Sequence, residues 1–173
     1  MSVLVTGGLG FIGLKVVIQL LKRGISTIVT DLDIERNKYR LTKNLKKNNI
    51  DETLINYQKL DITNIENVEE IFKLNKIDSI INLAYGIGSI CENDPLLASK
   101  INIVGTTSIF EMIVKYKIRR LVFTSSETVY GAKQSFFGNR PVNENDYSGI
   151  DNQYYTYGVM KLLNEFMAEK YIK

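Results

Sequence analysis

Chemistry in this sequence is most readily assigned to the stretch YYTYGVMK at residues 154–161, where three tyrosines precede a lysine. Tyr157 and Lys161 are four residues apart, so a helix would place their side chains on one face. Because free tyrosine has a pKa near 10, a tyrosine that acts as a base near pH 7 needs its phenolate stabilised by about 4 kcal/mol. A neighbouring ammonium group in a site closed to water favours the phenolate. The spacing therefore indicates Tyr157 as a candidate base and Lys161 as its partner.

The spacing does not decide the matter by itself, because it occurs a second time at Tyr39 and Lys43. That pair belongs to RNKYRLTKNLKKNN at residues 36–49, which is typical of a surface helix with a solvated basic face and contains Arg36, Lys38, Arg40, Lys43, Lys46 and Lys47. No glycine turn or strand end accompanies it, so we interpret it as a chance pair. Tyr154 and Tyr155 have no lysine four residues later, and we expect them to line a pocket or to pack.

A third group is expected beside such a pair, to hold the reacting hydroxyl of a substrate. The segment TSSETVYG at residues 124–131 ends a predicted strand. Ligands bind at the carboxyl ends of strands in parallel α/β sheets. Ser125 and Ser126 are both candidates for this role.

The segment TGGLGFIG at residues 6–13 lies between a predicted strand and a predicted helix and has glycines at positions 7, 10 and 13. In such turns one glycine permits the tight bend, one lets the backbone approach a pyrophosphate, and one allows the helix and strand to pack closely. The helix N-terminus then offers N–H groups and the positive end of its dipole to phosphates. A purely structural glycine turn is the alternative interpretation.

Asp31 favours the nucleotide interpretation of that turn. It ends the second predicted strand, 18 residues after Gly13, where an acid accepts hydrogen bonds from both ribose hydroxyls of NAD. A 2′-phosphate would be repelled there, and neither residue 32 nor residue 33 is an arginine, so we predict NAD rather than NADP. Asp61, which ends the third predicted strand, is similarly placed to meet the adenine, and its alternative role is that of an acid near the N-cap of the next helix.

Apolar runs predict strands, and longer amphipathic patterns predict helices, along the whole chain. Strands are expected at residues 2–6, 26–31, 54–61, 78–84 and 119–126. Helices are expected at 11–24, 36–49, 64–75, 95 to about 117, and from near Asp151 onward, after a turn-rich loop at 131–150. This alternation predicts right-handed βαβ units and an α/β fold with a parallel sheet. We expect one domain over residues 1–173.

Composition excludes several kinds of chemistry. The 173 residues include no histidine, which excludes Ser-His-Asp catalysis and most zinc sites, and we expect no metal site. Cys91 is the only cysteine, so no intrachain disulfide forms, and a reducing cytoplasm fits. The N-terminus has no signal pattern and no run of about 18 apolar residues occurs, so we expect no membrane span. The basic residues lack the pattern of a nucleic-acid-binding protein.

Taken together, these motifs resemble those of the extended short-chain dehydrogenase/reductases, in particular the NAD-dependent sugar epimerase/dehydratase group. The resemblance runs from residue 2 to about residue 170. It rests on VTGGLGFIG, an acid at 31, LDIT at 60–63, NLA at 82–84, NIVGT at 102–106, SSETVYG at 125–131 and YGVMKLLNE at 157–165. It implies an α/β, Rossmann-type, doubly wound parallel sheet with strand order 3-2-1-4-5 and helices on both faces.

The resemblance also implies roles for individual residues. Catalysis would fall to Ser126, Tyr157 and Lys161, and the substrate would contact Ser126, Glu127 and Tyr157. The residues that would bind NAD are Gly7, Gly10, Phe11, Ile12, Asp31, Asp61, Ile62, Leu83, Ala84, Tyr85, Asn102, Tyr157 and Lys161. Tyr157 would remove a proton from a sugar hydroxyl as hydride moves to NAD⁺, giving a transient keto sugar that takes the hydride back on its other face.

Three features depart from the family pattern. Family dehydratases carry Asp-Glu after the catalytic Ser/Thr, whereas this chain has Glu127 and Thr128, with a single carboxylate. Glu127 is thus either a solvated acid or a group for substrate binding or proton transfer. Asn82 stands where the family often has histidine. The chain stops at Lys173, whereas family members continue into a part that grips the nucleotide sugar, so we expect the substrate-binding C-terminal part to be absent.

A nucleotide-sugar epimerase is therefore our leading functional hypothesis. A nucleotide-sugar dehydratase, or an extended-family dehydrogenase of a non-sugar alcohol, is the second hypothesis. A non-catalytic NAD-binding sensor or scaffold is the third. The resemblance further implies a homodimer formed through helices 95–117 and 151–172, and we expect no nucleic-acid or membrane partner.

Overall fold

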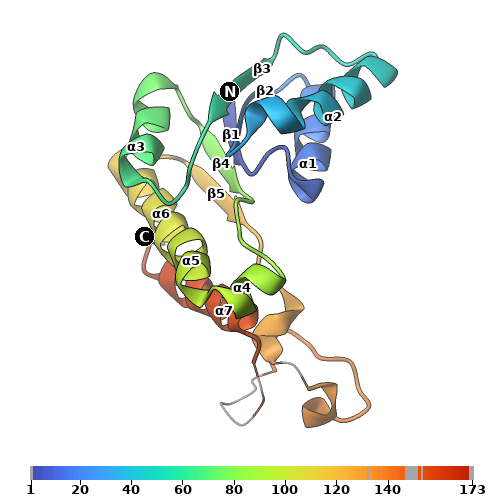
Figure 1. The fold of residues 1–173 in the computed structure, drawn as a ribbon, viewed down its shortest axis with the longest axis vertical. Helices are drawn as coiled ribbons and strands as arrows, with labels where there is room; N and C mark the ends of the chain where they lie inside the picture. The colour runs from blue at the N-terminus through green and yellow to red at the C-terminus, as the bar shows by residue number, and fades with distance from the viewer. Residues whose placement is uncertain (1, 132, 147–151, 153, 172–173) are drawn as a thin grey trace. The chain divides into compact units, whose positions relative to one another are not determined.

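The computed structural model describes residues 2–131, 133–146, 152 and 154–171 (Figure 1). The chain forms two compact units, each built from two segments. The first unit comprises Met1–Tyr85 and Ser108–Thr124, and the second comprises Gly86–Thr107 and Ser125–Lys173. We predicted one domain over residues 1–173. For the last predicted helix, the start near Asp151 and the end at residue 172 lie outside the described residues.

The first unit is built on a five-stranded parallel sheet with the order β3-β2-β1-β4-β5, which confirms the predicted fold class and strand order. Its strands are β1 (Ser2–Thr6), β2 (Ser26–Asp31), β3 (Ile55–Lys59), β4 (Ser79–Asn82) and β5 (Arg120–Phe123). Thr6 at the end of β1 pairs with Thr30 on one side and Asn82 on the other. The carboxyl ends of three central strands are therefore aligned, where the glycine turn begins.

The strands β3, β4 and β5 are shorter than the sequence predicts, because their ends turn into local hydrogen-bonded structure. After β3, the Asp61 carboxylate accepts hydrogen bonds from the N–H and hydroxyl of Thr63 at 2.9 and 2.7 Å. After β4, the N–H groups of Leu83 and Ala84 donate to the Thr6 hydroxyl at 3.2 Å. After β5, Ser126 caps a short 3₁₀ turn. Local side-chain bonds of this kind compete with ladder pairing.

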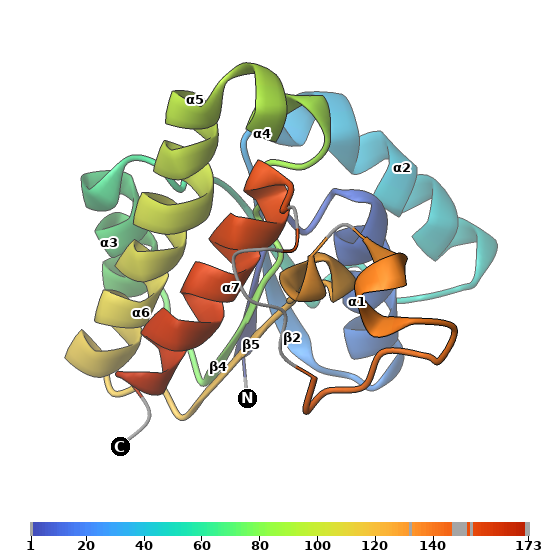
Figure 2. The same cartoon turned by 90° about the horizontal axis from the view of Figure 1, so that it is seen from below.

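Helices cover both faces of this sheet, with α1 (Phe11–Lys22) and α2 (Ile34–Lys47) on one face and α3 (Ile65–Leu74) and α6 (Thr106–Lys115) on the other (Figures 1 and 2). Three of these helices have an identifiable cap or a glycine that follows their last turn. Asp33 caps α2 by accepting from the Arg36 N–H, and Asn64 caps α3 by accepting from the Asn67 N–H. Gly24 follows α1 with a φ of +68°.

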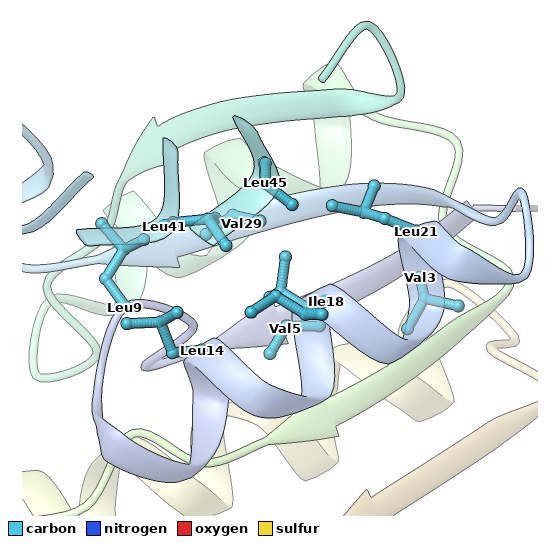
Figure 3. Packing of buried hydrophobic residues seen from close by; sticks show 10 residues of the cluster. Val3, Val5, Leu9, Leu14, Ile18, Leu21, Val29, Leu41 and Leu45 are labelled. Atoms are coloured by element: carbon cyan, nitrogen blue, oxygen red, sulfur yellow. The ribbon is translucent and has the colours of Figure 1, made fainter. Parts of the chain in front are cut away.

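The core beneath α1 and α2 is entirely aliphatic (Figure 3). It consists of Val3, Val5, Leu9, Leu14, Val17, Ile18, Leu21, Val29, Leu41 and Leu45. Leu14, Ile18 and Leu21 follow helical spacing on α1, so one stripe of this helix faces the sheet. On α2 only Leu41 and Leu45 are buried. The basic residues of α2 surround this stripe, which confirms the predicted surface helix.

The predicted helix from Pro95 is continuous to Lys115 but is not regular. It consists of α5 (Pro95–Ser99), a π-helical turn η1 (Lys100–Gly105) and α6. Asp94 fixes its start by accepting a hydrogen bond from the Leu97 N–H at 3.0 Å. By length and composition this run is long and apolar enough to cross a membrane, whereas we expected no run of that kind. Core helices of soluble proteins pass the same test, and 44% of its most apolar window is buried.

The second unit contains α5 and η1 together with α4 (Ser89–Asn93), η2 (Glu127–Tyr130), η3 (Gln134–Phe137) and α7 (Thr156–Glu169). The helix α4 and the turns η2 and η3 were not predicted, because they are too short to show a period. Helix α7 begins at Thr156, with Tyr155 as its extended N-cap residue. It thus starts five residues after the predicted Asp151, which lies outside the described residues.

Candidate active site

The glycine turn is held against the end of β4. Gly7 has a φ of +61°, and a Cβ added there would lie 2.9 Å from the Leu83 carbonyl and from the Ala84 nitrogen. A Cβ added to Gly13 would lie 2.2 Å from the Gly7 carbonyl oxygen. These two glycines are required by packing alone, as the structural interpretation holds. A Cβ on Gly10 would meet only the Gly7 oxygen, at 3.2 Å, so packing demands less of this residue.

The start of α1 has the chemistry of an anion site. Gly10 is its N-cap and provides no side-chain cap, and the first turn contains no acidic residue. Phe11 is 84% exposed and Ile12 is also exposed. The first N–H groups of a helix have no partner within the helix and carry the positive end of its dipole. The residues present therefore fit a pyrophosphate, as predicted for Gly7, Gly10, Phe11 and Ile12.

Asp31 lies at the end of β2, and its carboxylate also stabilises the turn. It accepts hydrogen bonds from the Leu9 N–H at 3.1 Å and from the Leu32 N–H at 2.9 Å. The carboxylate is thus fixed beside the glycine turn, where an acceptor for ribose hydroxyls is expected. Asp61 instead uses its carboxylate to close the turn before α3, whose N-cap is Asn64, and Ile62 is buried next to it.

The residues after β4 are held by Thr6, which the sequence analysis missed. Its hydroxyl accepts from the N–H groups of Leu83 and Ala84 and donates to the Asn82 side chain. Asn82 is buried and forms this bond in the position where the family often has histidine. Thr6 opens the segment TGGLGFIG, but nothing in that motif signals its bonds to the residues after β4. Leu83, Ala84 and Tyr85 are half-buried at the end of this unit's first segment.

In the second unit the structure brings the predicted catalytic residues together. Ser126 caps η2, where its hydroxyl accepts from the Thr128 N–H at 3.3 Å and the Thr128 hydroxyl at 2.9 Å. It donates to the Glu127 carboxylate at 3.1 Å and is hydrogen-bonded to Tyr157. Lys161 lies one turn further along α7, with its Nζ 5.7 Å from the centre of the Tyr157 ring.

Gly158 explains how Tyr157 comes close to Ser126. A Cβ added at Gly158 would lie 2.5 Å from the carbonyl oxygen of Thr128, so the first turn of α7 packs directly on the backbone of η2. Ser125 forms a second link between the same elements through a hydrogen bond to Glu165. Glu165 lies four residues after Lys161, and this continued i, i+4 spacing was the signal that could have identified it.

The surroundings raise rather than lower the pKa of Tyr157. Burial is the largest cause, the hydrogen bond to Ser126 opposes it, and the charges of Glu127 and, once its thiol is ionised, of Cys91 act in the same direction as burial. Burial also lowers the pKa of Lys161 to about 8, with an opposing contribution from Cys91. Lys161 is only 3% exposed. We expected the pKa of Tyr157 to fall under the combined charges of Lys161 and a bound nicotinamide ring, and among the groups that the chain itself provides burial outweighs the bond to Ser126.

Asn102 is fully buried in η1, and its side chain holds the loop that starts at Gly86. Its Oδ1 accepts from the Gly86 N–H at 2.7 Å, and its Nδ2 donates to the Gly86 carbonyl at 3.0 Å. The Cys91 thiol contacts the same Gly86 carbonyl and the Asn102 Nδ2. Asn102, which the resemblance places among the NAD-binding residues, thus makes a bidentate contact with the backbone of Gly86.

A pocket of about 370 Å³ lies beside Ser126 in the second unit. It is lined by Glu127, Thr128, Tyr130, Gly131, Lys133, Gln134, Phe137, Val142 and Tyr155. Tyr155 therefore lines a pocket, as expected, and Glu127 has access to whatever binds there. The competing pair, Tyr39 and Lys43, lies on α2, where Tyr39 is 65% exposed, so its interpretation as a chance pair is supported.

Comparison with known proteins gives this arrangement a family. The model of the NAD dependent epimerase/dehydratase family matches residues 3–173. The chain belongs to this family. It is 37% identical to UDP-glucose 4-epimerase 2 of Arabidopsis thaliana over 132 residues, which cover 75% of this chain and 37% of that protein. It is 30% identical to the UDP-glucose 4-epimerase of Bacillus subtilis over 95% of this chain and 46% of that protein.

Solved structures of the NAD dependent epimerase/dehydratase family agree with this assignment. The UDP-glucose 4-epimerase of Thermotoga maritima, solved with UDP-glucose, matches with a TM-score of 0.81 and 26% identity over 99% of this chain and 51% of that one. The enzyme from Bifidobacterium longum, solved with NAD⁺ and UDP, matches with a TM-score of 0.78 and 26% identity over 98% of this chain and 48% of that one. The chain thus spans less than half the length of its curated relatives and about half of these structures.

Proposed function

We propose that this family member acts as an NAD-dependent nucleotide-sugar epimerase, of the kind that inverts a sugar hydroxyl at C4. The observation that carries the proposal is the Ser126–Tyr157–Lys161 cluster on η2 and α7. The relatives in the comparisons are UDP-glucose 4-epimerases, which supports a UDP-hexose as the substrate. The glycine turn and Asp31 support NAD as the cofactor.

The roles of the chain's own residues follow from their contacts. Ser126 would hold the sugar hydroxyl, and Tyr157 would take its proton. NAD, when bound, would accept the hydride from the sugar carbon, return it to the opposite face, and contribute a positively charged ring that favours the phenolate. Lys161 would add its ammonium charge on the same side of Tyr157, from a buried position in which burial lowers its pKa to about 8. Glu127 would face the sugar from the adjoining pocket.

The direct test is incubation of the protein with NAD and UDP-glucose, followed by NMR of the sugar anomeric signals. We expect UDP-galactose to appear with no net change in the absorbance of NADH. A 4-keto-6-deoxy sugar would identify a dehydratase instead, and steady accumulation of NADH with an alcohol substrate would identify a dehydrogenase. Binding of NAD with no turnover of any of these would favour the sensor.

The dehydratase is retained as the second candidate because of one observation. Glu127 follows Ser126, lines the pocket, and accepts a hydrogen bond from the Ser126 hydroxyl. The next residue is Thr128, whose hydroxyl donates to Ser126 and provides no second carboxylate. Elimination of water with separate acid and base groups would therefore lack one of the two in this segment.

We further infer a cytoplasmic homodimer. The predicted contact helices, 95–117 and 151–172, correspond to the run from Pro95 to Lys115 and to α7. Within the second unit these helices expose Leu96, Leu97, Val104, Val159, Leu163 and Phe166. A second copy of the chain would cover such side chains. The single cysteine, Cys91, is buried as a free thiol, which suits a reducing compartment.

A further inference from the structure

Helix α7 carries a third polar side chain on the face that bears Tyr157 and Lys161. Asn164 lies seven residues after Tyr157 and three after Lys161, and these intervals bring a side chain back to the same face. Asn164 is 1% exposed. Its Nδ2 donates a hydrogen bond to the backbone carbonyl of Asn102 at 3.0 Å, and this contact is fully buried.

The acceptor of this bond lies in the irregular part of the long helix. Asn102 is in the π-helical turn η1, where the backbone departs from the i to i−4 ladder of an α-helix. Such turns occur frequently at functional sites. A donor from another helix is well suited to a carbonyl in a turn of this kind, because buried carbonyls are costly to leave without a partner.

The same residue, Asn102, holds the Gly86 backbone with its side chain. Asn164 is therefore one end of a buried chain of contacts that runs from α7 through the carbonyl and side chain of Asn102 to the loop at Gly86. Met160, one turn before Asn164, adds a contact between its Sδ and the Asn102 Nδ2 at 3.5 Å. The face of α7 that bears the candidate base is thus fixed to η1 at two successive turns.

We propose that Asn164 is a positioning residue that sets the register of α7 on η1, and with it the places of Tyr157 and Lys161 relative to the Asn102–Gly86 pair. The inference deepens the proposed function, because it matters for turnover only if Tyr157 is the base. Lys161 reports on the register most directly, since it is buried on α7 between Tyr157 and Asn164. Among the described residues, the titratable groups that act on Lys161 or Tyr157 include Cys91 from α4 and Glu127 from η2.

The test uses Asn164→Leu, which keeps the approximate volume of the side chain and removes its donor. The control is Glu169→Leu, the same kind of polar-to-leucine change at an exposed position at the end of α7. Two NMR measurements are made on each protein: the titration of Lys161, assigned with Lys161→Arg, and the hydrogen exchange of the Gly86 amide relative to that of Val5 in the first unit. Neither measurement requires turnover.

In Asn164→Leu we expect the pKa of Lys161 to move upward from about 8 toward its ordinary 10.5, because a displaced α7 exposes the ammonium. We expect the Gly86 amide to exchange at least roughly ten-fold faster while Val5 is unchanged, since each 1.4 kcal/mol lost locally is a factor of ten. Glu169→Leu should leave both values as they are. Loss of stability alone would not move the titration of Lys161 in the folded protein.

An unchanged Lys161 titration and an unchanged Gly86 amide in folded Asn164→Leu would overturn the proposal. If that variant does not fold, Asn164→Ser, whose hydroxyl is too short to reach the Asn102 carbonyl, is measured in the same way and judged by the same criteria. Turnover of UDP-glucose is then compared between the wild type, the Asn164 variants and the control variant. A protein with the expected shifts but no epimerase activity in any form supports the positioning role while refuting the proposed function.

Discussion

The surroundings of Tyr157 keep its phenol protonated at neutral pH, although the proposed reaction needs this residue as a base. Burial and the charge of Glu127 raise its pKa, and the bond to Ser126 only partly opposes them. In the proposed reaction, Lys161 and bound NAD would together supply the positive charges that favour the phenolate, so we expect Tyr157 to become reactive when the cofactor is in place. Such conditional reactivity would protect the site from side reactions.

Replacing the candidate base tests this assignment. Tyr157→Phe keeps the ring on α7 and removes the hydroxyl that meets Ser126. Because a positioned acid–base group contributes about 10²–10⁴-fold to a rate, we expect kcat to fall by at least that amount while the affinity for NAD stays within roughly two-fold. Steady-state kinetics and calorimetric titration with NAD provide the two numbers. Ordinary activity in this variant would remove Tyr157 from its role.

Glu127 is expected to tune Tyr157 through its charge. Glu127→Gln keeps the size of the side chain and removes a negative charge that raises the pKa of Tyr157. We therefore expect the pKa of Tyr157 to fall in this variant. The measurement is a titration followed by NMR of tyrosine labelled at Cζ, with Tyr157→Phe to assign the signal. A higher pKa would show that the carboxylate does not act on the phenol through its charge.

Lys161 gives a prediction about stability and pH. Its pKa is about 8 in the folded protein and 10.5 as its ordinary value. Between these pH values the unfolded chain binds more protons than the folded one, so the free energy of unfolding rises with pH in this window. At 1.36 kcal/mol per unit, we expect the stability of the wild type relative to Lys161→Met to increase by about 3 kcal/mol from pH 8 to 10.5. Urea unfolding of both proteins across that range is the measurement, and a flat difference would contradict the burial of the charge.

At the scale of elements, the glycine turn combines two demands that fall on different residues. Gly13 is required because a Cβ would overlap the Gly7 carbonyl, whereas a Cβ on Gly10 would meet the same oxygen at 3.2 Å, a tight contact that a small shift relieves. Gly13 is therefore explained by packing, and the proposed approach of the backbone to a pyrophosphate falls on Gly10.

We expect Gly13→Ala to lose about 1–3 kcal/mol of stability, the usual cost of overpacking a buried contact. Gly10→Ala should unfold near the wild-type midpoint but bind NAD more weakly, because its Cβ would stand where the turn approaches the phosphates. Thermal unfolding and NAD titration of both variants distinguish these outcomes. If Gly10→Ala binds NAD as tightly as the wild type, the turn does not approach a pyrophosphate at that residue.

The strands and helices of the first unit could be predicted because their apolar patterns are long. The position of α2 could be predicted from Leu41 and Leu45 within a basic segment. Asp31 could be identified because it is the acid that ends β2. The shortened ends of β3 and β4 could not be predicted, since they depend on Thr63 and Thr6 hydroxyls that meet partners only in the folded chain. Asn164 was missed for the same reason, because its partner is a backbone carbonyl that no sequence pattern marks.

At the scale of the whole molecule, the chain spans less than half the length of the curated relatives. It contains the residues that we propose for NAD and for proton transfer, and a pocket that reaches Glu127. In the proposed function, the sugar would meet Glu127 and Lys133 together with the aromatic side chains that line this pocket.

The proposed homodimer is testable at this scale. Phe166 on α7 is 55% exposed, and Glu in its place would bury a charge in any interface formed by this helix. We expect the wild type to elute as a dimer by size exclusion with light scattering and Phe166→Glu to elute as a monomer. The control is Glu169→Gln, at the end of the same helix. A wild-type monomer would reject the proposed assembly.

The interleaving of the two units has a consequence for how the protein is made. In the order β3-β2-β1-β4-β5, the strand that completes the sheet is at its edge, so the first four strands can pair before β5 leaves the ribosome. The segment Gly86–Thr107 emerges earlier still, but two of its contacts are made by residues that follow much later. Thr156 contacts Glu92 from 64 residues further along the chain, and Asn164 contacts Asn102 from 62 residues further along. Contacts this distant in sequence form late. Nascent chains that end before α7 should therefore be cut by protease within this segment while the sheet resists.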